Sequence, residues 1–82
     1  MSRIEKYLQQ LYAAEFESGE YEDEANPKEM IKLLKRAYNW KNHSNLQDVC
    51  THLGAECDDR VETIEGCKEI IMEEIEYWKA EI

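Results

Sequence analysis

Three cysteines and two histidines are the side chains of this sequence best suited to hold a metal ion or to act as nucleophile and base. Cys50, Cys57 and Cys67 lie seven and ten residues apart, and no C-x-x-C pair occurs. Structural zinc sites usually take ligands in pairs two to four residues apart. The odd number and wide spacing of the cysteines instead predict reduced thiols. We expect neither a metal ion nor another cofactor.

A catalytic role is not expected for Cys57 or His43. Cys57 stands among acidic residues, which lower the reactivity of a thiol. His43 falls in a predicted turn without an acidic residue beside it to orient the ring. The sequence contains no Gly-rich phosphate loop, no G-x-S-x-G and no H-E-x-x-H motif. We therefore predict that the protein is not an enzyme.

Carboxylates dominate the charged groups, with 19 acidic against 10 basic residues and a net charge of -9. Residues 1–25 carry -5, residues 26–55 carry +3 and residues 56–82 carry -7. In the last segment glutamates recur every three or four residues, which places them on one side of a helix. Such a stripe is typical either of a solvated helix face or of a surface that binds a basic partner. The candidate partner-binding residues are Glu20, Glu22, Asp23, Glu24, Glu62, Glu65, Glu69, Glu73 and Glu76.

Acidic groups spaced along a helix can imitate the phosphates of a duplex and attract a positively charged groove. The sequence therefore predicts a non-enzymatic acidic protein that binds and inhibits or regulates another protein. Small nucleic-acid mimics of the anti-restriction, anti-CRISPR or immunity type act in this way. The expected partner is a basic or nucleic-acid-binding protein, and we expect no direct contact with nucleic acid or with a membrane.

Residues 26–55 have the opposite charge, and their basic residues fall on one predicted helix that a short helix follows. This order is typical of a helix-turn-helix that contacts DNA. Seventeen acidic residues outside the segment would repel a duplex, however, so this is the third-ranked hypothesis. Ion pairs from Lys32, Lys35 and Arg36 to the acidic helices are the simpler interpretation.

A set of apolar residues at the margins of the predicted core is a candidate interface, because Trp and Tyr are enriched at protein contacts. A chain of about 80 residues can also gain buried surface by pairing with a second copy. The alternative function is thus a structural or assembly subunit that forms a homodimer through its last helix. The residues of this candidate apolar interface are Trp40, Ile70, Tyr77, Trp78 and Ile82.

Helices must position these residues. One proline, three glycines, 43% hydrophobic and 35% charged residues favour a single all-α domain over 1–82. Apolar residues repeat at steps of three and four, which predicts helices over 3–17, 27–41, 45–53 and 60–81, with a loop over 18–26. Short connections favour a small antiparallel bundle of about four helices.

Capping signals set the predicted helix starts. Ser44 with Gln47, and Asp59 with Glu62, have the spacing of capping boxes. Gly66 falls inside the last predicted helix, where glycine costs about 1 kcal/mol relative to alanine in an exposed position. A destabilising Gly66→Ala would therefore indicate that another helix closely approaches its backbone.

The longest uncharged apolar stretch has four residues, far short of the roughly 20 that cross a bilayer. The mean hydropathy is -0.78. The first residues carry charges and no apolar run of the secretory type. The expected location is the cytoplasm.

Overall fold

The protein folds into a small all-α bundle, as the sequence predicts. The computed structural model describes residues 3–15, 18–19, 22–23, 27–55 and 57–81. Its helices are α1 (Arg3–Glu15), α2 (Pro27–Tyr38), α3 (His43–His52) and α4 (Ile64–Lys79), with a 3-10 turn η1 (Asp59–Glu62) before α4. Between α1 and α2 the predicted loop contains a two-residue antiparallel pair, β1 (Ser18–Gly19) and β2 (Glu22–Asp23), with Ser18 opposite Asp23.

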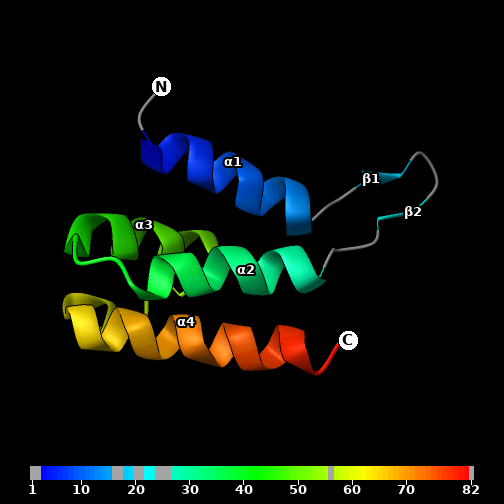
Figure 1. The fold of residues 1–82 in the computed structure, drawn as a ribbon. Coiled ribbons are helices and arrows are strands. Elements are labelled where there is room, and N and C mark those ends of the chain that lie inside the picture. Colours follow the sequence, from blue (N-terminus) through cyan, green and yellow to red (C-terminus); the bar gives the residue numbers. More distant parts are fainter. Residues whose placement is uncertain (1–2, 16–17, 20–21, 24–26, 56, 82) are drawn as a thin grey trace.

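Helix α2 lies at the centre of the bundle and packs against both α1 and α4 (Figure 1). It runs antiparallel to each of them. Four buried residues follow one another at steps of three, one and three along α2, which is the spacing of a core-facing stripe. They are Met30, Leu33, Leu34 and Ala37. The basic residues of α2 lie on its other side and are exposed.

All four helices contribute to one apolar core. Leu11, Leu34, Leu46 and Ile71, one from each helix in chain order, are fully buried. Half-buried apolar side chains, among them Trp40, pack around this cluster. No helix within the described residues is both long enough and apolar enough to cross a membrane.

Helix α2 ends at Tyr38, three residues before the predicted end, because the backbone forms a tighter turn there. The backbone N–H of Trp40 donates to the carbonyl of Ala37 at 2.9 Å, and the Asn39 side chain donates to that of Lys35 at 3.0 Å. These bonds satisfy carbonyls that a longer helix would have used. The described part of helix α1 runs to Glu15, and the last two residues of the predicted helix, 16–17, lie outside the described ones.

Helix α3 begins at His43 rather than at residue 45, and its predicted capping box is wrong. The Asn42 side chain caps the helix and accepts a hydrogen bond from the N–H of Asn45 at 3.1 Å. Gln47 donates instead to the carbonyl of Val61 at 3.0 Å. The helix ends at His52, one residue before the predicted end.

The predicted helix over 60–81 is divided into η1 and α4. The Asp59–Glu62 capping box is wrong, since Thr63 is the N-cap and its hydroxyl accepts from the N–H of Gly66 at 2.9 Å. At 16 residues α4 is about 24 Å long, shorter than the roughly 33 Å of a 22-residue helix. A Cβ atom on Gly66 would collide with the carbonyl of Arg60. The close approach at Gly66 thus comes from η1 and not from another helix.

One carbonyl oxygen fixes η1 to two helices. The Val61 carbonyl accepts from His43 Nε2 at 2.8 Å, from Gln47 Nε2 at 3.0 Å and from Cys67 Sγ at 3.4 Å. A carbonyl can only accept, so His43 carries its hydrogen on Nε2. His43, expected in a turn, therefore starts α3 and holds the 3-10 turn in place.

Candidate functional site

The exposed side of α4 carries four glutamates. Glu65, Glu69, Glu73 and Glu76 are all exposed. At 3.6 residues per turn they fall within about 80° of the helix circumference. We call these four residues the acidic face of α4. Glu62 is also exposed and lies on η1, directly before the helix.

Arg60 of η1 neutralises part of this face. Its guanidinium pairs with the carboxylate of Asp58 at 2.8 Å, with that of Glu73, and with that of Glu69 at 3.5 Å. Hydrogen bonds from Arg60 hold the pKa values of Asp58 and Glu73 below their ordinary range. Glu76 pairs with Lys79 at 3.6 Å. The face is therefore partly paired rather than a row of free charges.

The sequence did not indicate that Arg60 pairs with the acidic face, because in a continuous helix its side chain would point away from Glu69. Nine residues separate Arg60 from Glu69, which in an unbroken α-helix places them on roughly opposite sides. The 3-10 turn and the Thr63 cap redirect the chain, so that Arg60 reaches the acidic face. The glycine at position 66 was the available signal, since it permits that turn to pack closely.

The candidate apolar interface is only partly exposed. Ile70 and Trp78 are 5% and 8% exposed and belong to the core, so their assignment to an interface is wrong. Helix α4 packs against both α2 and α3, which makes its buried side wider than a single stripe. Tyr77 is 55% and Met72 37% exposed, and these two residues flank the acidic face.

The other candidate residues are not among the four that define the acidic face. Trp40 is half-buried on the opposite side of α2 from α4 and packs against Tyr7 of α1. Glu22 and Asp23 form β2, of which the backbone is described. Glu20, Glu24 and Ile82 lie outside the described residues.

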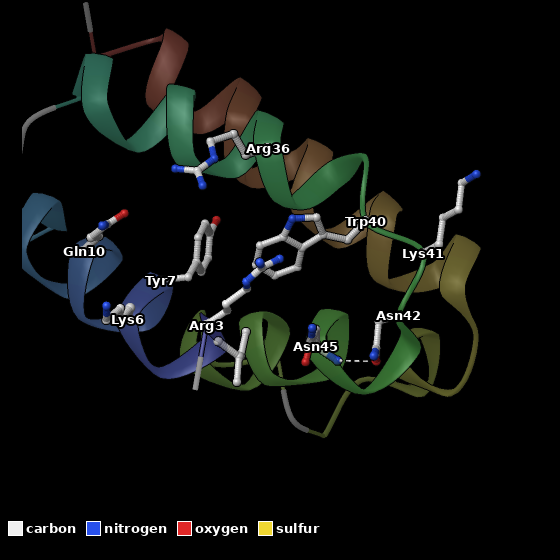
Figure 2. Close-up of a pocket in the computed structure, with 10 residues that line it drawn as sticks. Arg3, Lys6, Tyr7, Gln10, Arg36, Trp40, Lys41, Asn42 and Asn45 are labelled. Atoms are coloured by element: carbon white, nitrogen blue, oxygen red, sulfur yellow. Dashed lines mark hydrogen bonds between the residues drawn. The ribbon is translucent and has the colours of Figure 1, made fainter. Parts of the chain in front are cut away.

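A second candidate site is a pocket of about 500 Å³ between α1, the end of α2 and the start of α3 (Figure 2). Four basic side chains line it together with two aromatic rings and three amides. Within the described part of the chain, its lining includes no acidic residue. We call it the basic pocket. Its lining residues are Arg3, Ile4, Lys6, Tyr7, Gln10, Arg36, Trp40, Lys41, Asn42 and Asn45.

Two packed rings form an aromatic wall of the basic pocket. The ring centroids of Tyr7 and Trp40 lie 4.6 Å apart in an edge-to-face arrangement. The Tyr7 hydroxyl donates to the carbonyl of Leu33 at 2.6 Å, and the residue is 4% exposed. Burial raises the pKa of Tyr7 far above its ordinary value, and the charge of Arg36 opposes that rise in part. Tyr7 is therefore a neutral, fixed part of the wall.

The basic residues of α2 are exposed, and the ion pairs given for described residues do not include them. Those ion pairs are made by Arg60 and Lys79. The predicted pairing of Lys32, Lys35 and Arg36 inside the bundle therefore stays a prediction. Arg36 lines the basic pocket.

The groups of the basic pocket are suited to binding an anion. Its described lining contains no carboxylate, imidazole or thiol. Elsewhere, burial raises the pKa of the Cys50 thiol to about 12, and Cys67 is buried as well. Among the described residues, no three His, Cys, Asp or Glu side chains gather where they could hold a metal ion.

Comparison of the chain with known protein families, with curated proteins and with solved structures finds no match. The acidic face and the basic pocket are therefore the observations from which a function can be argued.

Proposed function

We propose that this protein is a non-enzymatic binding protein that recognises a basic protein partner through the acidic face of α4 and thereby inhibits or regulates it. One observation carries this proposal. Four exposed glutamates occupy one side of the longest helix, and the exposed Met72 and Tyr77 lie at the two edges of that side.

Each part of the surface has a physical role in binding. A row of like charges steers a partner of opposite charge and raises its association rate. Met and Tyr side chains are enriched in interface cores, where they supply apolar contact area. Negative charge and exposed apolar side chains on the same face favour a protein partner over a small cation.

Nucleic-acid mimicry is the narrower form of this proposal. Successive glutamates four residues apart advance about 6 Å along α4. A DNA strand places one phosphate per roughly 3.4 Å of axis. Since Arg60 also pairs with Glu69 and Glu73, α4 is less charged than a DNA strand. The geometry therefore favours binding to a basic protein surface in general. Nucleic-acid mimicry applies only if DNA competes with this protein for the same partner.

Self-association through α4 has less support. A symmetric dimer would place two acidic faces against each other, and their charges repel. With Ile70 and Trp78 in the core, only Met72 and Tyr77 remain exposed along the described part of α4 as large apolar groups.

A cytoplasmic location is part of the proposal. All three cysteines are free thiols, two buried and one exposed. Free thiols persist in a reducing compartment, and this chemistry supports the cytoplasm.

Paired charge-reversal variants test the acidic face. Glu65→Lys with Glu76→Lys reverses two of its charges without touching the carboxylates that contact Arg60. The control, Glu5→Lys with Asp48→Lys, makes the same net change on α1 and α3, at exposed positions away from α4.

Quantitative affinity capture with the wild-type chain and both variants gives the readout. We expect the wild type and the control to retain the same basic protein equally. The α4 variant should retain at least tenfold less of it, and rising salt should lower its retention by the wild type at least tenfold. Equal retention by all three chains would overturn the proposal. Displacement of the captured protein by a DNA duplex would support the narrower mimicry.

A further inference from the structure

We propose that the basic pocket is a separate ligand site that binds a nucleoside phosphate, a small anion in which an aromatic base is joined to phosphate. The site lies on α1, α2 and α3 and shares no residue with the acidic face of α4. It therefore stands independently of the proposed protein partner.

The concentration of positive charge is the first observation. Four of the ten basic residues of the chain line this one pocket, although the chain carries 19 acidic residues. Arg3 and Lys6 come from α1, Arg36 comes from α2, and Lys41 follows α2. A concave surface lined by one sign of charge concentrates its field and attracts small ions of the opposite sign. Guanidinium groups in particular match the geometry of phosphate oxygens.

The aromatic wall is the second observation. Trp40 is partly exposed and lines the pocket, and the edge-to-face contact with Tyr7 fixes its orientation. In Figure 2 the guanidinium groups of Arg3 and Arg36 and the two rings occupy the middle of the view. A nucleobase can stack on such a ring, and stacking contributes roughly 1–3 kcal/mol per base. An inorganic anion would leave this wall unused.

Amide groups complete the set of ligand-binding groups. Gln10, Asn42 and Asn45 line the same pocket, and their side chains carry both donors and acceptors. The Asn42 Oδ1 atom already accepts from the backbone of Asn45, which holds that side chain in place. Amides of this kind can bind the edge of a base or the hydroxyls of a ribose.

The size of the pocket and the charge around it favour a mononucleotide over a polymer. A volume of about 500 Å³ falls in the usual range of small-molecule sites, roughly 300–1,000 Å³. A nucleic-acid strand would extend beyond the pocket over a chain of net charge -9, where its phosphates meet repulsion.

The two tryptophans allow a direct test by NMR. The indole N–H of Trp40 reports on the pocket, while that of Trp78 lies in the core and serves as an internal control. The probes are ATP, GTP, CTP and UTP, with adenosine, inorganic triphosphate and a single-stranded oligothymidylate for comparison. We expect at least one nucleotide to shift the Trp40 signal and leave that of Trp78 in place. Adenosine and triphosphate should each bind at least tenfold more weakly.

A matched pair of variants locates the site. Arg36→Gln should weaken nucleotide binding at least tenfold, whereas Lys32→Gln, an equal loss of charge on α2 outside the pocket, should change it less than twofold. Both positions are exposed, and an unshifted Trp78 signal verifies the fold.

Three results would overturn the inference. They are a Trp40 signal that stays fixed at millimolar nucleotide, equal binding of triphosphate and nucleotide, and tighter binding of the oligothymidylate than of any mononucleotide. None of them bears on capture of a basic protein by α4, so the two proposals can fail separately.

Discussion

The acidic face of α4 and the basic pocket carry opposite charge, and the chain builds them in different ways. The acidic face comes from one helix, whose glutamates recur every three or four residues. The basic pocket takes its cations from two segments about thirty residues apart, which meet because α1 packs against α2. A periodic surface of one helix can thus be predicted from sequence, whereas a pocket between helices depends on the packing.

The two regions also differ in the interactions that hold their residues in place. The acidic face is tied to η1 by Arg60, and this junction requires Gly66. The basic pocket is held by the aromatic contact and the buried hydrogen bond of Tyr7. Changes at these three residues should therefore disturb one region and spare the other.

Gly66→Ala should have the largest effect. A methyl group at this position meets the carbonyl of Arg60, so η1 or α4 must shift. We expect a loss of about 2–3 kcal/mol in the free energy of unfolding, by analogy with overpacked sites. Urea denaturation measures it, with Glu65→Ala at the neighbouring exposed position as the control. A gain of stability, as in an exposed helix interior, would show that η1 does not pack against Gly66.

Tyr7→Phe should have an intermediate effect. The change removes the buried donor to the Leu33 carbonyl and keeps the ring against Trp40. The expected loss is about 1 kcal/mol in the free energy of unfolding, measured by thermal or urea denaturation. Tyr77→Phe, at a residue that is largely exposed, should change stability by less than about 0.5 kcal/mol. Equal effects of the two substitutions would contradict the anchoring role of Tyr7.

Arg60→Gln should have the smallest effect on stability, and its dependence on pH is diagnostic. Arg60 lowers the pKa values of Asp58 and Glu73 in the folded chain. A carboxylate with a lowered folded-state pKa stabilises the fold above its unfolded pKa, and this contribution is lost as the pH falls through the folded value. The wild type should thus exceed the variant in stability at pH 7, with the difference vanishing well below about pH 4.

Unfolding by urea at pH 7, 5 and 3 tests this dependence. The control, Arg3→Gln, removes one positive charge at the basic pocket. Its effect on the free energy of unfolding should not change with pH in step with the titration of Asp58 and Glu73. A pH-independent difference for Arg60→Gln would show that the ion pairs do not form in solution.

The bundle itself was largely predictable, because each helix carries its own apolar period. The stripe of α2 from Met30 to Ala37 is an example, and Pro27 marks its start. The start of α4 was not predictable from the same rules. Asp59 with Glu62 and Thr63 with Gly66 offer competing caps, and the contacts of η1 with α3 and α4 decide between them.

The candidate sites divide in the same way. The sequence located the glutamates of α4, and the structure shows them exposed. It misplaced Ile70 and Trp78, because the width of a buried helix face depends on how many neighbours pack against it. It missed the basic pocket, since Arg3 and Arg36 have no sequence relation that a local pattern could detect.

The convergence of three donors on the Val61 carbonyl has a kinetic consequence. Two of the donors, His43 and Gln47, belong to α3, and the third, Cys67, belongs to α4. A four-residue 3-10 turn has little stability alone, so these bonds require both helices to be in place. Interactions that form after the folding transition state influence mainly the unfolding rate. We therefore expect loss of these bonds to raise the unfolding rate of the bundle more than it lowers the folding rate.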